Sequence, residues 1–364
     1  MFVFITFTIK HIKQNEFMFC MGVAITSILE SKEIKLEDLS GKILAVDAFN
    51  TLYMFLTTIR GPDGSPLMDS KGRITSHLVG LFSRFSNLLE KGIKFVFVFD
   101  GVPPDLKREE RERRKSLKME ASKLYEDAKQ KEDIQNMKKY AARTVFLTKD
   151  MVLEAKALVK AMGIPIVDAP SEGESQAAFM VKQGDAYAVM SQDADALLSG
   201  SPRCIRNISI TGKRKMPGSY NYKTINPELF VLQENLSLLG LTQDQLIVLS
   251  ILVGTDYNYG GVKGIGPKKA LKLIEKHKDN FEEIFSEAKW SESFSVAWKE
   301  IFNTIKEMPV TKDYKLDFNK PDSASIKKLL VEVYEFSEDR VNSTLDKLEV
   351  ASKLNEQKGL SDFF

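Results

Sequence analysis

The strongest structural signal in this chain is the run Lys94-Phe95-Val96-Phe97-Val98-Phe99-Asp100, in which aromatic and β-branched residues alternate before a terminal acid. This composition predicts a buried β-strand. Lys42-Ile43-Leu44-Ala45-Val46-Asp47 repeats the pattern, and we expect two further strands at 163–167 and 186–190. Helical patterns occur at 74–90, 150–162 and 173–183. Strands that alternate with helices predict an α/β fold with a mostly parallel central sheet, helices on both faces and ligands at the carboxyl ends of the strands.

Acidic residues gather at or beside these predicted strand ends and after one further apolar run. They are Asp47, Asp100, Glu172, Glu174, Asp193, Asp195 and Asp256. Seven carboxylates that converged in a fold would repel one another unless cations neutralised them. A site made only of carboxylate oxygens suits Mg²⁺ or Mn²⁺. The pattern therefore indicates metal-assisted phosphoryl chemistry.

Each acid also has a purely structural explanation. Ser171-Glu172-Gly173-Glu174 has the spacing of a capping box, in which Ser171 caps a helix and Glu174 is its third residue. Asp47 and Asp100 could cap the helices that follow them, and the pair Asp193/Asp195 could be turn residues. Caps and turns do not predict, however, that every recognisable strand end should carry acids. We therefore favour one shared site.

Composition limits the classes of partner. The chain has 364 residues, 43% of them hydrophobic, enough for one large domain or two smaller ones. Lys and Arg number 52 against 50 Asp and Glu, so the net charge of +2 alone predicts no nucleic-acid binding. The 2 cysteines and 3 histidines lack metal-ligand spacing, which favours a reducing cytosol and argues against zinc. The apolar start of the chain is too short to span a membrane, and we expect a cytoplasmic, nucleoid-associated protein.

The segment 105–149 is dense in alternating charge and poor in apolar residues. Such runs are usually solvated helices with i,i+4 ion pairs. Because this segment is inserted directly after Asp100, we favour a helical excursion over the strand ends that carries cations to a phosphate.

The stretch 242–277 predicts a helix, a tight turn and a second helix. Glycines dominate the turn at 260–266, and Pro267 occupies a helix start, where its missing N–H costs little. Glycines let a backbone approach a ligand closely, and a helix N-terminus offers free N–H groups to phosphate. A simple helix connection would look similar. The nearby lysines, Lys263, Lys268 and Lys269, favour sequence-independent binding of a DNA backbone.

The tail 355–364 is polar and then ends in aromatic residues. A polar terminus gains nothing by displaying Leu360, Phe363 and Phe364 to water. Packing on the body of the chain is the simpler explanation. The spacing of Gln357, Leu360 and the two phenylalanines is better suited to a peptide that docks on a partner.

Four motifs, in this order, carry a family resemblance: Val98-Phe99-Asp100-Gly101-Val102-Pro103-Pro104, Ala169-Pro170-Ser171-Glu172-Gly173-Glu174-Ser175-Gln176-Ala177, Ser191-Gln192-Asp193-Ala194-Asp195, and Leu252-Val253-Gly254-Thr255-Asp256-Tyr257 with Gly264-Ile265-Gly266-Pro267-Lys268. They resemble the flap endonucleases of the XPG-type 5′-nuclease family, most closely the archaeal form, over essentially all of Met21–Phe364. The resemblance implies a PIN-like 5′-nuclease fold with a helical arch and a helix-hairpin-helix element. The tail is similar to the family's motif for docking on the sliding clamp, PCNA.

Matching positions imply roles for individual residues. The seven acids align with residues that hold two divalent ions, some through water. Lys107 and Arg114 match basic residues of the arch that reach the scissile phosphate and serve catalysis. Tyr53 matches an aromatic on which a base stacks, and Arg84 matches a phosphate-contacting arginine. The remaining implied DNA contacts are Gly22, Arg60, Glu172, Gly254, Asp256, Lys263, Gly264, Gly266, Lys268 and Lys269.

The implied enzyme is a structure-specific hydrolase that cuts 5′ flaps near their base and leaves a 5′-phosphate. It also has 5′–3′ exonuclease activity and acts in Okazaki-fragment maturation and base excision repair. Its cofactors are two Mg²⁺ ions per subunit, for which Mn²⁺ could substitute, and K⁺ at the helix-hairpin-helix. We expect a monomer that binds branched DNA and the sliding clamp, with no membrane partner. Two alternatives stay open: another nuclease of this scaffold, such as a 5′ exonuclease, a junction resolvase or an RNA-cleaving relative, and a non-catalytic clamp-binding adaptor.

The expected organisation has an N-terminal nuclease region at 21–120, an arch at 105–149 and an internal nuclease region at 150–278 that contains the helix-hairpin-helix at 242–277. A C-terminal helical region at 279–354 and the clamp-binding tail follow. Family members begin at a position that matches Met21, so we expect residues 1–20 to be a gene-start error. Intact-mass measurement of the native protein tests this, because the twenty residues should be missing.

Overall fold

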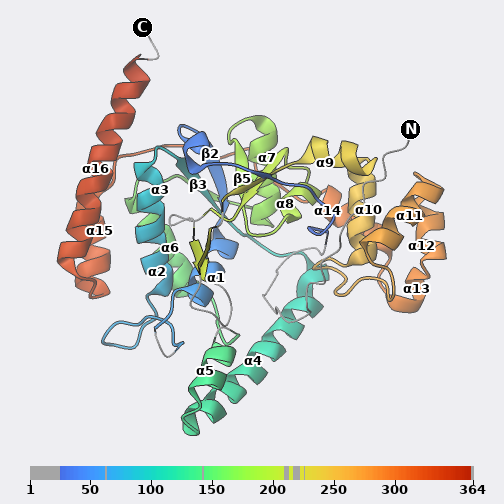
Figure 1. Ribbon diagram of the computed structural model, residues 1–364, viewed down its shortest axis with the longest axis horizontal. Coiled ribbons are helices and arrows are strands. Elements are labelled where there is room, and N and C mark those ends of the chain that lie inside the picture. The colour runs from blue at the N-terminus through green and yellow to red at the C-terminus, as the bar shows by residue number, and fades with distance from the viewer. Residues whose placement is uncertain are drawn as a thin grey trace.

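A seven-stranded sheet forms the centre of the molecule (Figure 1). The computed structural model describes residues 25–61, 64–141, 143–208, 213–215, 222–224 and 226–361, the last twelve by their backbone alone. Across the sheet the strands are β1 (Lys32–Glu33), β9 (Glu228–Val231), β6 (Arg203–Arg206), β5 (Ala188–Met190), β2 (Ile43–Asp47), β3 (Lys94–Phe99) and β4 (Ile166–Asp168). A separate antiparallel pair consists of β7 (Lys213–Lys215) and β8 (Tyr222–Thr224).

Most of the sheet is parallel, as the sequence predicts. β2 pairs in parallel with β3 and with β5, β3 pairs with β4, and β5 pairs with β6. Only β9 opposes this direction among the described strands of the sheet, between β1 and β6. The chain builds from β2 through β3 to β4 on one side and from β5 to β6 on the other. The boundary between β2 and β5 is therefore the switch point at which such sheets bind ligands.

The alternation in β3 separates two cores. Phe95, Phe97 and Phe99 belong to one buried cluster, and Phe85 packs between two of them, with ring centroids 4.9 Å and 4.7 Å away. Val96 and Val98 point to the opposite cluster. Each such buried side chain contributes about 1.5–3 kcal/mol to stability, so both sheet faces must be covered.

Helices cover both faces. The phenylalanine side packs against α1 (Ala48–Thr58), α2 (Ser76–Gly80), α3 (Ser86–Glu90) and α6 (Lys149–Ala161), and the valine side packs against α7 (Gly173–Gln183). The helix predicted at 74–90 is continuous but contains a π-helical turn at Leu81–Phe85. Gly80 precedes this turn and lies flat against Phe55, since a Cβ there would be 2.3 Å from the ring.

The predicted helical excursion is present. A short 3₁₀ turn at Asp105–Lys107 leads into α4 (Arg108–Gln130), which packs beside α5 (Ile134–Ala141). Figure 1 shows this pair projecting from the body below the sheet. It is the arch that the sequence predicts after Asp100.

The second half of the chain supplies a further buried cluster around α10 (Gln243–Val253). The remaining helices are α8 (Asp195–Leu198), α9 (Leu232–Leu239), α11 (Pro267–His277), α12 (Phe281–Glu287), α13 (Trp290–Ser293), α14 (Trp298–Lys306), α15 (Ser323–Lys327) and α16 (Glu338–Ser361), with a 3₁₀ turn at Leu36–Leu39 and a π-helical turn at Lys328–Val333. Pro267 begins α11, as predicted. Within the described chain, no single helix has the length and apolarity to cross a membrane, and α9 with α10 passes that test only as a pair bent by 77°.

The C-terminal region differs in part from the prediction of a helical block at 279–354. Residues 307–322 form neither helix nor strand and contact α7, where the Gln176 side chain donates to the carbonyl of Thr311 and accepts from its N–H. The predicted boundary at 354/355 falls inside α16, which continues to Ser361. Residues 1–20, Gly22, Phe363 and Phe364 lie outside the described residues.

Candidate active site

The carboxyl ends of four neighbouring parallel strands bring the predicted acids together. Asp47 is the last residue of β2, and Asp100 follows β3. Glu172 and Glu174 follow β4 at the start of α7, while Asp193 and Asp195 follow β5. Asp256 follows α10 and approaches the same edge through its ion pairs with the arch.

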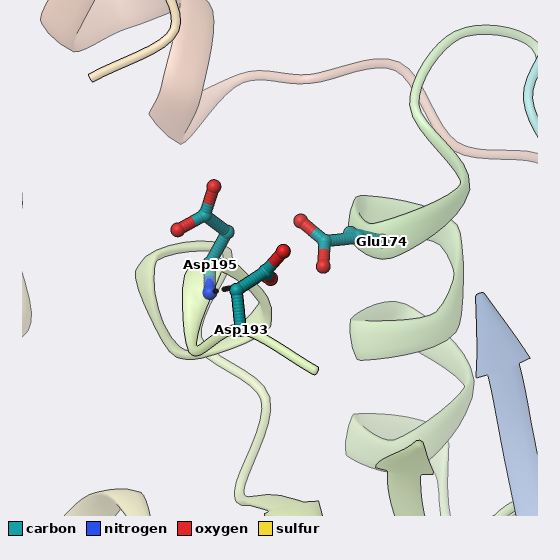
Figure 2. Close-up of side chains that lie close together, drawn as sticks. All are labelled: Glu174, Asp193 and Asp195. Atoms are coloured by element: carbon teal, nitrogen blue, oxygen red, sulfur yellow. Dashed lines mark hydrogen bonds between the residues drawn. The ribbon is translucent and has the colours of Figure 1, made fainter. Parts of the chain in front are cut away.

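Three of the acids form a compact cluster. Glu174, Asp193 and Asp195 each offer a carboxylate oxygen, and these oxygens lie within 4.8 Å of one another. In Figure 2, Glu174 projects from the first turn of α7 toward Asp193, on the loop after β5, and Asp195, the first residue of α8. Desolvation and the charges of Asp193 and Asp195 raise the pKa of Glu174 well above its ordinary value. Such a cluster is stable in its charged form only beside a cation.

Asp47 connects this cluster to the sheet. Its carboxylate accepts the Asn50 N–H at 3.0 Å and so caps α1, while the Asn50 side chain donates to Asp193 at 3.0 Å. Burial raises the pKa of Asp47, and the nearby Asp100 raises it further. The predicted structural explanation for Asp47 is confirmed, yet the same carboxylate also belongs to the acidic site.

Asp100 caps a different helix from the one expected. Its Oδ1 accepts the Gly173 N–H at 2.7 Å, at the start of α7. Asp100 as a whole is exposed, but desolvation of its carboxyl group and the charge of Glu172 raise its pKa to about 6, although the hydrogen bond from Gly173 lowers it. A Cβ at position 173 would lie 2.6 Å from this oxygen, so a side chain there would displace the Asp100 carboxylate.

The predicted capping box is wrong. The Ser171 hydroxyl donates to the Val102 carbonyl at 2.9 Å, and the N-cap residue of α7 is Glu172. Glu174 accepts instead from the Ser191 hydroxyl at 2.9 Å and faces the other acids. Ser171 therefore holds the loop after β3, and Glu174 belongs to the acidic site. The turn explanation for Asp193 agrees with the structure, because it accepts the Asp195 N–H at 3.4 Å.

The two predicted cations stand over the acids. Lys107 Nζ lies 2.5 Å from Glu172 and 3.4 Å from Asp256, and Arg114 donates to Asp256 at 2.5 Å. Burial alone would lower the pKa of Lys107, but the charges of Glu172, Tyr257 and Asp256 outweigh it and raise the pKa. Lys107 also lies 5.2 Å from the Tyr257 ring centroid. Sequence reasoning missed Tyr257, although it directly follows Asp256.

The other candidate DNA contacts lie around this centre. Tyr53 on α1 has Lys118 4.6 Å from its ring centroid, a partner that sequence reasoning missed within the charged run. Arg84 lies over the Phe55 ring at 5.1 Å, and Arg60 donates to the carbonyls of Thr57 and Gly64. Their contacts with DNA stay predictions.

The glycine-rich turn has the predicted shape. Lys263, Gly264, Gly266, Lys268 and Lys269 are all exposed, and Lys269 donates to the Gly264 carbonyl at 2.8 Å. Gly254 has a φ of 122° and lies against the turn backbone. Lys272 and Lys276, which the sequence did not single out, line an adjacent groove of about 320 Å³ on α11.

The residues fit a hard divalent cation. A cavity of about 30 Å³, lined in part by Glu172, Glu174, Asp195 and Asp256, has room for about one water or ion. Its acid donors are all carboxylate oxygens, the ligands that Mg²⁺ and Mn²⁺ prefer. Lys107 and Arg114 supply two positive charges against seven acids, so the site as folded is short of cations.

The sheet, the arch and the acidic edge define a nuclease of the PIN-like 5′-nuclease fold. Family models for the XPG N-terminal domain and the XPG I-region match residues 21–121 and 163–256. The chain belongs to the flap endonuclease family, since it is 50% identical to Flap endonuclease 1 of Pyrococcus abyssi over 344 residues, which are 94% of this chain and 98% of the relative.

Other comparisons agree. Flap endonuclease 1 of Pyrococcus furiosus is also 50% identical over 94% of this chain and 99% of its own length. The solved flap endonuclease-1 from Methanococcus jannaschii superimposes with a TM-score of 0.71 and 42% identity, over 91% of this chain and 98% of that one. Human GEN1, solved in complex with Holliday junction DNA, shares the fold with a TM-score of 0.67 and 24% identity, over 93% of this chain and 80% of that one.

Proposed function

We propose that this protein is a structure-specific 5′ flap endonuclease that hydrolyses a phosphodiester bond near the base of the flap. The observation that carries the proposal is the acidic edge at the sheet's switch point with Lys107 and Arg114 directly above it. The names of the 50%-identical relatives support the flap as substrate. The complete set of seven acids argues against a non-catalytic adaptor.

The seven acids would hold two divalent ions, preferably Mg²⁺ with Mn²⁺ as a substitute. When bound, such ions lower the pKa of a water molecule and stabilise the attacking and leaving oxygens. Lys107 and Arg114 contribute positive charge to the phosphate. Arg can bind its oxygens through two N–H groups, whereas Lys acts as a point charge. To do so Lys107 would release Glu172 and Asp256, and Arg114 would release Asp256, which frees both carboxylates for cations.

The remaining assignments are part of the same proposal. The exposed lysines of the glycine-rich turn would grip the backbone of duplex DNA, with a K⁺ site on the turn, and specificity would come from the shape of the DNA. The protein would act as a cytoplasmic monomer in Okazaki-fragment maturation and base excision repair. Its tail would dock on the sliding clamp.

The test incubates purified protein with a 5′-flapped duplex, a nicked duplex, a gapped duplex and a four-way junction, with Mg²⁺ and with chelator. We expect cleavage of the flap that needs the metal and leaves a 5′-phosphate. Cleavage in chelator would contradict the metal assignment. Equal cutting of the four-way junction would favour a junction resolvase instead.

A further inference from the structure

Glu110 is an almost buried carboxylate at the base of the arch, with 6% of its surface exposed. It accepts three hydrogen bonds from two consecutive arginines: from Arg113 Nε at 2.6 Å and Nη2 at 2.8 Å, and from Arg114 Nε at 2.6 Å. Burial alone would raise the pKa of Glu110, but the bonds from Arg113 and Arg114 outweigh it and lower the pKa. The residue is therefore a fixed negative charge.

The two arginines extend from Glu110 to two points of one loop, between α10 and α11. Arg114 donates from Nη2 to Asp256 at 2.5 Å. The Arg113 guanidinium stacks on the ring of Tyr259, 3.6 Å from its centroid, and Tyr259 is otherwise 63% exposed. One carboxylate thus joins the arch base both to the acidic site and to the loop that leads into the glycine-rich turn.

This geometry fixes one end of the Arg114 guanidinium. Nε is held by Glu110, so the terminal nitrogens can only swing about that anchor, between Asp256 and a phosphate above the acids. An arginine without such an anchor would lose more side-chain conformational entropy when it binds a phosphate.

We propose that Glu110 is a positioning residue that aims Arg114 at the scissile phosphate; this inference rests on the proposed flap cleavage. Glu110 touches neither metal ligands directly nor the substrate, and it acts through Arg114. The Arg113–Tyr259 stack holds the arch base against the hairpin loop while Arg114 moves. A residue that only stabilised the arch would affect folding and DNA binding, but not the cleavage step alone.

The test compares Glu110→Gln with the matched control Glu112→Gln, an exposed acid on the same helix. Single-turnover cleavage of a 5′ flap at saturating protein should fall about 10- to 100-fold in Glu110→Gln, the usual effect of losing a residue that orients a catalytic group. The flap dissociation constant should change by less than about threefold and the melting temperature by no more than about 4 °C. Glu112→Gln should match the wild type in all three.

A double-mutant cycle with Arg114→Ala gives the decisive comparison. Because Glu110 acts through Arg114, adding Glu110→Gln to Arg114→Ala should lower the rate no further. Additive losses, or a rate loss matched by weaker DNA binding, would overturn the proposal. If Glu110→Gln fails to fold, Glu110→Asp, which is too short to reach both arginines, takes its place in the same cycle.

One readout does not depend on cleavage. The Nε–H signals of Arg113 and Arg114 in ¹⁵N spectra should exchange slowly with water in the wild type and in Glu112→Gln, and quickly in Glu110→Gln. Equal exchange rates in all three proteins would contradict the anchoring. A wild type with protected Nε–H groups that cuts no flap would refute the proposed function while leaving the anchor in place.

Discussion

Asp47 and Asp100 each hold a helix N-terminus with Oδ1, and the carboxylate then keeps a second oxygen for a cation. The positive end of each helix partly offsets the charge of the capping acid. Capping and metal binding are therefore compatible at the residue scale. Glu174 and Asp193 differ, because they cap no helix. The Ser191 hydroxyl donates hydrogen bonds to both, the Asn50 amide donates to Asp193, and the two acids lie close to each other.

We expect Asp193→Asn to abolish most metal-dependent cleavage. Losing a ligand of a divalent ion removes several kcal/mol of transition-state stabilisation, which corresponds to a rate loss of at least about a hundredfold. The fold should survive, since the substitution removes one of several crowded charges. Flap cleavage and thermal melting measure the two effects, with the exposed Asp105→Asn as control. Undiminished cleavage by Asp193→Asn would contradict the site.

Stability without metal should fall as the pH rises. Desolvation and like charges raise the pKa of Asp47, Glu174 and Asp193, and that of Asp100 to about 6. The folded protein therefore binds more protons than the unfolded chain between about pH 4, the ordinary carboxyl value, and pH 6. Below pH 4 these groups contribute stability to the folded protein, and this stability is lost as the pH rises through their pKa values in the folded state.

Mg²⁺ should accordingly raise the melting temperature little at pH 5 and more at pH 8, where it replaces protons among the acids. Thermal melting in chelator and in Mg²⁺ across this range measures the difference. Asp100→Asn keeps an oxygen for the Gly173 N–H and should flatten the pH dependence in chelator. A Mg²⁺ effect of equal size at both pH values would count against the assignment.

At the scale of elements, the turn between α10 and α11 depends on one glycine above the others. A Cβ on Gly261 would lie 2.2 Å from the Val253 backbone, and its φ is 61°. Gly266, by contrast, has a φ of −99° and open space. We expect Gly261→Ala to destabilise the protein by about 3 kcal/mol or more, because backbone strain and a backbone collision combine.

Gly266→Ala serves as the matched control and should change the melting temperature by no more than a few degrees. Affinity for duplex DNA, measured in chelator, should fall in Gly261→Ala because the turn presents the exposed lysines. Equal melting temperatures for the two variants would show that the turn tolerates a side chain at 261.

The same elements show how far the sequence could predict this molecule. β2, β3, α7 and α11 were predicted because their patterns are local: alternating apolar runs, helical periodicity and a proline at a helix start. That the acids converge is also predictable, because the carboxyl ends of parallel strands lie at the same edge of a sheet. The capping box failed because its hydrogen bonds were taken by partners distant in sequence, Val102 and Ser191. The irregular segment 307–322 is hydrogen-bonded at Thr311 to Gln176, a contact that no local pattern reveals.

Across the whole molecule, the distribution of charge matters more than its near-zero sum. The arch base sets Lys107 and Arg114 against the acidic edge, and a second group of lysines, Lys269, Lys272 and Lys276, lines the groove on α11. The local positive charge attracts a polyanion and brings its phosphates beside acids that bind metal. The overall charge of +2 conceals that division.

The C-terminal helix should separate folding from partner binding. Val341, Leu345 and Leu348 bury one stretch of α16 in the main core, while Figure 1 shows its end projecting beyond the body. Deleting 357–364 should leave basal flap cleavage and the melting temperature unchanged, and should abolish stimulation by the sliding clamp. Leu345→Ala is the contrasting control, since it should cost about 2–5 kcal/mol of stability. If the deletion itself lowers basal cleavage or the melting temperature, the tail packs on the body and is not a docking peptide.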